Sequence, residues 1–193
     1  MKYYKVIIDG NEPEFPFVVK LDKKYYNKYW EIVNNGEIIK EWPDDISFYS
    51  CQDGVPATQL GNDCGWMIFS DEAIEVFNKN NIFGFQYLPV KVYTMITKLL
   101  LENYNQVANI IEKANCFDME NSKYRLIGDE RPDLKGQIAV ITDIVLIKDK
   151  IKENIDIFRL NECTTYIIAN ERFVKLYKKN KFNGLNFKEV KLV

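Results

Sequence analysis

Neighbouring carboxylates are the side chains in this sequence best suited to catalysis, because two acids can serve as general acid and general base. The sets considered as candidates are Asp44 with Asp45, Asp118 with Glu120, and Asp129 with Glu130. Each set lies in a segment whose composition predicts a solvated turn, which explains the acids without catalysis. A carboxylate-dependent hydrolase or transferase therefore stays as an alternative function, and the sequence marks no catalytic residue.

Other reactive groups are scarce. The chain contains no histidine, so it lacks the usual catalytic triad, a histidine proton shuttle and imidazole metal ligands. Gly54, Gly61 and Gly65 share one loop, but the strand, helix and lysine of a phosphate-binding loop do not flank them. Ser70 follows a predicted strand without the glycines of a nucleophile elbow, so we predict that it caps a helix.

Charge and hydropathy exclude further classes. The 193 residues carry 26 basic and 28 acidic side chains, a net charge of -2, which does not favour a nucleic-acid partner. No apolar run near the first residue has signal-peptide length, and the most apolar later stretch, Met95 to Leu101, is interrupted by Lys98. We expect a cytoplasmic protein with no membrane partner and no cofactor.

The cysteines are few and widely spaced. None of the four forms a C-x-x-C pair, so neither a disulfide scaffold nor a zinc site is predicted. We expect reduced, mostly buried thiols, with one structural disulfide as the alternative. The four are Cys51, Cys64, Cys116 and Cys163.

Short strands with turn punctuation dominate the first part of the chain. Apolar and β-branched runs predict strands at Tyr3–Ile8, which ends at the turn dipeptide Asp9-Gly10, at Phe15–Leu21 and at Ile46–Ser50. Asn34-Asn35-Gly36 lies between two apolar runs, 29–33 and 37–40, and predicts a β-hairpin.

Two segments resemble each other. IFSDEAIEVFNKNNIFGFQYLPV, from Ile68, matches IIANERFVKLYKKNKFNGLNFKEV, from Ile167, about 99 residues later if one residue is inserted. Each reads as a strand, a polar cap, an amphipathic helix, a turn glycine and a closing strand. The predicted caps are Ser70 or Asp71 in the first segment and Asn170 in the second, and the turn glycines are Gly84 and Gly184. We predict two related strand-helix-strand units, with chance similarity between amphipathic segments as the alternative.

The stretch between these units is ambiguous. Apolar residues from Ile96 to Ile111 keep helical spacing, so periodicity predicts a long helix across the first part of 104–117. Further strands are predicted at 138–147 and 155–160, and a polar loop at 129–136. The fold class is α+β, with short-stranded, mostly antiparallel sheets. We expect one domain over 1–193, and the alternative is two lobes, 1–65 and 66–193.

Aromatic residues gather near residue 30. Tyr25, Tyr26, Tyr29 and Trp30 fall within six residues, and Trp42 follows. Tyrosine and tryptophan are common at interface hot spots, but core packing is the commoner use of such a cluster. Trp30 and Trp42 are therefore candidate partner-binding residues, with core packing as the alternative.

Three segments in this order resemble a bacterial immunity-protein family found beside polymorphic toxins. The first is Met67 to Val92, the second is Tyr104 to Tyr124, and the third is Asp156 to Val190. The last two segments contain positions typical of that family, which are Asn109, Asp118, Ser122, Phe158-Arg159-Leu160 and Gly184-Leu185-Asn186-Phe187. The region of Gly36 and Trp42-Pro43 is similar to the family too.

The resemblance implies an α+β protein that binds and neutralises a cognate toxin, encoded next to it, without catalysis, and we expect it to act by occlusion. The alternatives are a carboxylate-dependent hydrolase or transferase, and an interaction module without a toxin partner. It also implies that 107–117 is extended, against the helical spacing. The stretch 93–103 is longer than the family pattern and reads as a helical insertion.

The family positions are expected to serve the scaffold. A buried Arg159 paired with Asp118 would explain both residues, since buried charges must be matched. Gly184 is expected to supply a turn. Toxin contacts are expected on exposed loops, where Asp44, Asp45, Asp129 and Glu130 would mimic phosphate if the toxin is a nuclease with a basic cleft.

Overall fold

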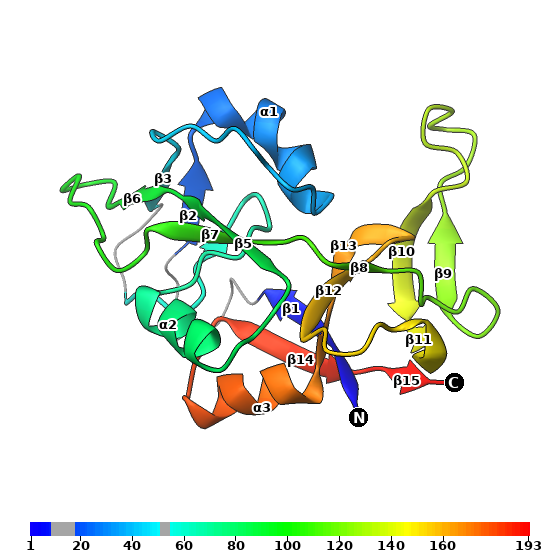
Figure 1. The fold of residues 1–193 in the computed structure, drawn as a ribbon. Coiled ribbons are helices and arrows are strands. Elements are labelled where there is room, and N and C mark those ends of the chain that lie inside the picture. Colours follow the sequence, from blue (N-terminus) through cyan, green and yellow to red (C-terminus); the bar gives the residue numbers. More distant parts are fainter. Residues whose placement is uncertain (9–17, 51–54) are drawn as a thin grey trace.

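The computed structural model describes residues 1–8, 18–50 and 55–193, and these form three α-helices and fifteen short strands (Figure 1). The helices are α1 (Lys23–Asn34), α2 (Asp71–Lys79) and α3 (Glu171–Lys179). The strands are β1 (Tyr3–Ile8), β2 (Val18–Leu21), β3 (Ser47–Ser50), β4 (Gly61–Asn62), β5 (Phe85–Pro89), β6 (Lys91–Tyr93), β7 (Gln106–Ile110), β8 (Lys113–Ala114), β9 (Lys123–Leu126), β10 (Ile138–Asp143), β11 (Val145–Leu146), β12 (Ile157–Leu160), β13 (Cys163–Asn170), β14 (Leu185–Glu189) and β15 (Lys191–Leu192).

The strands form several small mixed sheets. The largest has the order β14-β1-β13-β12-β8, and a four-stranded sheet has the order β4-β2-β3-β6. Two-stranded sheets join β5 to β7, β9 to β10 and β11 to β15. Six of the ten pairings are antiparallel and four are parallel. The α+β class is confirmed.

The two predicted strand-helix-strand units are present and share more than the sequence indicates. In the first unit, residues 58–60 pair with residues 68–70, α2 follows, and β5 pairs with β7. In the second unit, β12 pairs with β13, α3 follows, and β14 pairs with β1. We call β7 and β1 the completing strands of the first and second unit. The strand before each helix also pairs with the completing strand, through the Ile68–Val107 bridge in the first unit and the β1–β13 ladder in the second.

The helices begin in the same way. The Ser70 hydroxyl accepts the N–H of Ala73, and the Asn170 side chain accepts the N–H of Phe173, so both predicted N-caps are confirmed. The cap residues also make equivalent backbone hydrogen bonds. The N–H of Ser70 donates to the carbonyl of Thr58, and the N–H of Asn170 donates to the carbonyl of Asp156, both at 2.8 Å.

The helices also end in the same way, one hundred residues apart. Asn81 and Lys181 both adopt positive φ, at 50° and 57°, and glycines with positive φ follow at 84 and 184. The equivalent positions run from 68 to 90 and from 168 to 190 without a gap, so the inserted residue expected from the sequence is not needed. The mismatch arose because the second string starts one residue early.

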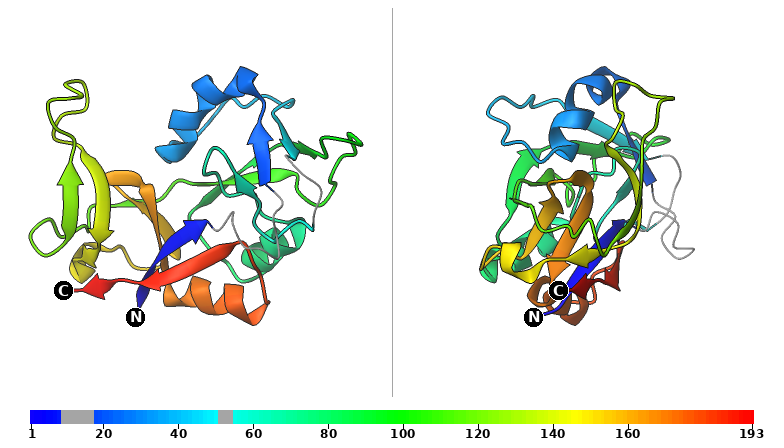
Figure 2. Two further views of the ribbon diagram at one scale, coloured as in Figure 1. Left: turned by 180° about the vertical axis from the view of Figure 1, so that it is seen from behind. Right: turned by 90° about the vertical axis from the view of Figure 1, so that its right-hand side faces the viewer.

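Each unit takes its completing strand from a different place in the chain. β7 follows β5 after β6 and one loop, whereas β1 is the first strand of the chain and lies between β13 and β14 (Figures 1 and 2). The first strand and the last strand but one, β14, therefore meet in one sheet. Whether the chain is one domain or two lobes stays a prediction.

The predicted hairpin around Asn34-Asn35-Gly36 is wrong. The segment belongs to α1, in which Tyr25, Tyr29 and Val33 form one buried stripe at four-residue spacing. Gly36, at φ 64°, follows the helix end, and its N–H bonds to the carbonyl of Val33. The glycine thus ends a helix, because a left-handed residue after the last turn is the usual helix stop.

The helix predicted from spacing across 104–117 is also wrong, and the extended conformation implied by the family is confirmed. β7 pairs along its whole length with β5, from Phe85 opposite Ile110 to Pro89 opposite Gln106. Four of its five residues are buried. A strand buried on both faces has no alternation, so its apolar run resembles helical spacing. The stretch 93–103 forms turns rather than the expected helix.

Three clusters of buried side chains form the core. One lies beneath α1 and the four-stranded sheet, one between α2 and α3, and one against β12. Cys64, Cys116 and Cys163 are free thiols, and burial raises the pKa of Cys116 to about 12. Cys51, Gly54, the Asp9-Gly10 turn and residues 15–17 of a predicted strand lie outside the described residues.

Candidate functional site

Family positions converge on the loop that follows α1. The amide of Asn109 donates to the carbonyl of Glu37 at 2.8 Å. A Cβ on Gly36 would lie 2.5 Å from the carbonyl oxygen of Ile110 and 2.9 Å from Cδ of Arg159, so only glycine allows this approach. These residues fasten the α1 loop to β7 and β12, which supports the scaffold role expected for them.

Arg159 is almost fully buried, at 2% exposure, and has no carboxylate partner in the described part of the chain. Its Nε donates to the carbonyl of Ile110 at 3.1 Å, and its Nη1 donates to that of Thr164 at 2.7 Å. Burial lowers the pKa of Arg159 to about 10. The expected ion pair with Asp118 is therefore wrong, because backbone carbonyls take the guanidinium instead.

Asp118 organises its own turn. Its carboxylate accepts the N–H groups of Glu120 and Asn121 and the Asn121 amide, at 2.9, 3.1 and 2.7 Å. These bonds, above all that from the Asn121 amide, hold its pKa below the usual value. Ser122 then exchanges hydrogen bonds with the backbone of Val145. The spacing D-x-x-x-S thus ties this turn to β11.

Three of the remaining family positions make packing contacts or form a turn. Phe158 is fully buried and meets the ring of Tyr3 at 6.2 Å between centroids. Phe187 packs against Tyr177 at 5.4 Å. Gly184, at φ 89°, provides the expected turn, and a Cβ there would collide with the carbonyl oxygen of Gln59.

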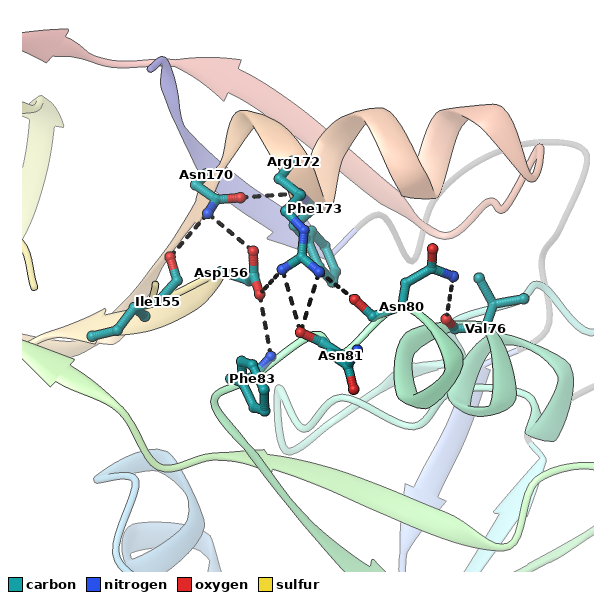
Figure 3. Close-up of polar contacts among 9 residues, drawn as sticks. All are labelled: Val76, Asn80, Asn81, Phe83, Ile155, Asp156, Asn170, Arg172 and Phe173. Carbon is teal, nitrogen blue, oxygen red and sulfur yellow. Dashed lines mark hydrogen bonds and ion pairs between the residues drawn. The ribbon is translucent and has the colours of Figure 1, made fainter. Parts of the chain in front are cut away.

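A buried carboxylate that the sequence does not single out joins the two units (Figure 3). Asp156, whose side chain is 2% exposed, accepts the N–H of Phe83, the amide of Asn170 and Nη1 of Arg172, at 3.2, 3.1 and 2.6 Å. Arg172 also donates to the carbonyls of Asn80 and Asn81 at the end of α2.

The hydrogen-bond partners of Asp156 are structural elements of the two units. All its strong donors are fixed by the fold, and its one charged partner, Arg172, is occupied by helix-end carbonyls. No sequence signal marks Asp156, because its partners are distant along the chain. The backbone hydrogen bonds of the structure, rather than the sequence alignment, make Asp156 equivalent to Thr58.

The candidate tryptophans differ in exposure. Trp30 lies on α1 and is 38% exposed. Trp42 is partly buried against the core, where its ring lies 5.0 Å from that of Tyr29 and 5.9 Å from that of Trp66. Its Nε1 donates to the carbonyl of Pro89 at 2.7 Å. Of these two side chains, Trp30 is the more exposed, and its role in binding stays a prediction.

The four candidate acids lie in two separate places. Asp44 and Asp45 precede β3, whereas Asp129 and Glu130 lie in the loop of the β9–β10 hairpin, on the opposite side of the molecule (Figures 1 and 2). Lys24 pairs with Asp45 at 3.0 Å and Lys135 pairs with Asp129 at 2.5 Å. The four therefore do not form one phosphate-like surface, and a role for either pair stays a prediction.

An exposed apolar loop was missed as a site. It consists of Met95, Ile96, Leu99 and Leu100, which are 58%, 73%, 63% and 46% exposed. The sequence signal was the apolar run interrupted by Lys98. Contiguous exposed apolar surface is a common mark of a protein interface.

Two searches for other kinds of site gave nothing within 1–8, 18–50 and 55–193. No cluster of three or more cysteine and carboxylate side chains there could hold a metal ion. None of the described helices is long and apolar enough to cross a membrane.

Comparison with known proteins identifies the family. No curated protein matches the chain. The model of the Imm11 immunity protein family matches residues 7–192, which include all three segments that carry the resemblance. The chain therefore belongs to the Imm11 immunity protein family.

Proposed function

We propose that this protein binds one cognate bacterial toxin, encoded next to it, and neutralises it by occlusion without catalysis. The observation that carries the proposal is the family match, which spans nearly the whole chain and implies toxin immunity. The proposal is also supported by the site geometry, in which family positions fasten loops and the buried carboxylate Asp156 joins structural elements.

Occlusion requires a surface large enough for a specific complex. Such complexes bury roughly 1,200–2,000 Å² in total, about half on each partner. The chain exposes 10869 Å², so its half of such an interface would take a small part of its surface. Proteins that act in this way need complementarity, and they need no reactive group.

Growth rescue tests the proposal. The product of the adjacent reading frame is expressed alone and with this protein, and growth and co-purification are scored. Rescue with a stable complex is expected. If both proteins are folded and neither rescue nor binding occurs, the proposal is wrong and the carboxylate-enzyme alternative returns.

A further inference from the structure

The apolar loop is held in a defined conformation by its own backbone. The N–H of Thr94 donates to the carbonyl of Leu99, and the N–H of Leu99 returns to the Thr94 hydroxyl, both at 2.9 Å. Lys98 adopts φ 51°, which tightens the turn. The N–H of Met95 donates to the hydroxyl of Ser50 at 3.1 Å, so the loop is anchored to β3. A loop that is ordered before binding loses little entropy on association.

The loop stands between two hollows. Leu100 lines one of about 630 Å³, together with Pro89 and Tyr104. Met95 lines the other, of about 350 Å³, together with Tyr49. Beside the loop, the rings of Tyr49 and Tyr93 are stacked at 5.7 Å. A projecting apolar element flanked by hollows and rigid aromatic rings matches the anatomy of an interface core.

The two hollows differ in net charge. Lys20 and Lys23 border the one beside Met95, with Asp22, whose carboxylate caps α1, between them, and neither lysine forms an ion pair within the described part of the chain. Asp44 and Glu102 border the hollow beside Leu100 together with Lys91, and neither acid forms an ion pair among described residues. A protein surface that fits would place a carboxylate near the lysines and a cation near the acids, with an apolar recess between them.

The loop also lies outside the repeated frame. In the first unit it falls between β6 and β7, whereas in the second unit β1 is the completing strand, so no equivalent loop leads to it from β14. The frame is therefore complete without the loop.

We propose that the apolar loop, with its flanking hollows, is the surface that contacts the cognate toxin. This inference rests on the proposed function and names the surface that performs it. The alternating charges favour a protein over an anionic membrane, which would select lysines without the acids Asp44 and Glu102. A second copy of the chain could match these charges only in a twofold dimer that sets the loop against itself in reverse, so the mass of the protein in solution decides between a dimer and a partner.

Two single substitutions test the loop, and a third serves as the matched control. Leu99→Asp and Ile96→Asp each place a charge on a side chain that is more than half exposed, so the fold is expected to persist. Leu126→Asp makes the same change on β9, at 43% exposure, in the hairpin that carries Asp129 and Glu130. Circular dichroism and thermal unfolding verify that each variant is folded.

Growth rescue and affinity for the toxin are measured with wild type and all three variants. Both loop variants are expected to weaken binding by at least about tenfold and to lose rescue, while Leu126→Asp keeps both. Rescue by folded loop variants at wild-type affinity would overturn the inference, as would a loss seen only with Leu126→Asp. Failure of the wild-type chain to rescue would instead contradict the proposed function on which the inference rests.

Two further measurements separate other occupants of the loop. Wild-type protein is sedimented with phosphatidylglycerol–phosphatidylethanolamine vesicles, and its mass in solution is measured by light scattering. A monomer that does not sediment with vesicles is expected. Vesicle binding abolished by Leu99→Asp, or a dimer dissociated by it, would assign the loop to a membrane or to self-association and overturn the inference.

Discussion

The two repeated units meet at two equivalent points, and the chemistry there differs. At one, the turn of the first unit donates the N–H of Phe83 to the carboxylate of Asp156. At the other, the turn of the second unit donates the N–H of Asn183 to the hydroxyl of Thr58 at 3.3 Å. Each unit therefore supplies a turn to the other, and the contacts are related by an approximate twofold exchange.

The difference shows that the same backbone arrangement accommodates a neutral hydrogen-bonded contact at one point and a charged contact at the other. The neutral contact is completed by the Asn183 side chain, which accepts the N–H of Thr58 at 2.6 Å, and by its carbonyl, which accepts the N–H of Gln59. The charged contact instead needs Arg172, because a buried carboxylate without a cation would carry a large desolvation cost. The shared geometry lies in the backbone and the glycines.

The largest effect is expected where the units approach most closely. Gly184→Ala places a methyl group against the carbonyl oxygen of Gln59 at positive φ, and we expect a loss of about 4 kcal/mol in the free energy of unfolding. Gly84→Ala, with Ile157 O at 2.5 Å from the new Cβ, should behave similarly. Denaturant unfolding measures both.

Gly136→Ala is the control for this prediction. Gly136 also has positive φ, at 83°, but a Cβ there meets nothing within 4 Å. Gly136→Ala therefore measures backbone strain without a collision, and we expect it to lower the free energy of unfolding by about 1 kcal/mol. Equal losses in all three variants would show that the units do not press on each other at the glycines.

The charged contact is expected to matter more than the neutral one. Asp156→Ala removes the acceptor of three donors and leaves Arg172 without its carboxylate, so a loss of about 3 kcal/mol is expected. Thr58→Ala removes the hydroxyl that accepts the N–H of Asn183, and we expect a loss of about 1 kcal/mol in the free energy of unfolding. Chemical denaturation of the two variants in parallel gives the difference, and the reverse order would contradict this account of the exchange.

The turn between the first two strands of each repeated unit provides a second comparison. In the first unit, Asn62 fills this turn, bonding through its amide and its oxygen to the backbone of Leu60, Cys64 and Trp66. Asn62→Ala should cost about 2 kcal/mol in stability, since several backbone groups lose a partner together. An unchanged midpoint of thermal unfolding would mean that water replaces the amide.

In the second unit, the same connection carries Glu162, one of whose oxygens is buried without a hydrogen-bond partner in the described structure. Burial raises the pKa of Glu162, so the folded state binds a proton more readily than the unfolded chain and loses stability as pH rises through the folded pKa. Glu162→Gln should therefore be more stable than wild type at pH 7, by about 0.5 kcal/mol after solvent screening.

The pH dependence provides the check on Glu162. Below the ordinary glutamate pKa, both states of wild type are protonated and the difference between the two proteins should vanish. Unfolding is measured at pH 4 and pH 7. A gain from Glu162→Gln that is equal at both values would show that charge at this position is not the cause.

The repeats and their caps could be predicted because they depend on local signals. Ser70, Asn170 and the glycines at 84 and 184 lie next to the elements that they begin or end. The α1 helix was missed because the Asn-Gly step that favours a hairpin also suits a helix end, and only burial of Tyr25 and Tyr29 against the sheet decides between them.

The contacts of the candidate site could not be predicted, because they join residues far apart in the chain. Arg159 was expected to be buried, but its partners are carbonyls of Ile110 and Thr164, which no residue type reveals. Asp156 and Phe83 are 73 residues apart in the chain, and only the packing of the two units brings them together. Carbonyl acceptors are present at every residue, so sequence favours side-chain pairs and misses such solutions.

Titration of toxin activity with this protein tests neutralisation by occlusion most directly. Purified toxin at a concentration well above the dissociation constant is mixed with increasing amounts of the protein, and residual activity is followed with time. Occlusion predicts that inhibition is immediate, is complete near one equivalent, and that toxin recovered from the complex is unmodified and active. Inhibition that progresses with time at far less than one equivalent, leaving altered toxin, would contradict the account and identify the protein as an enzyme.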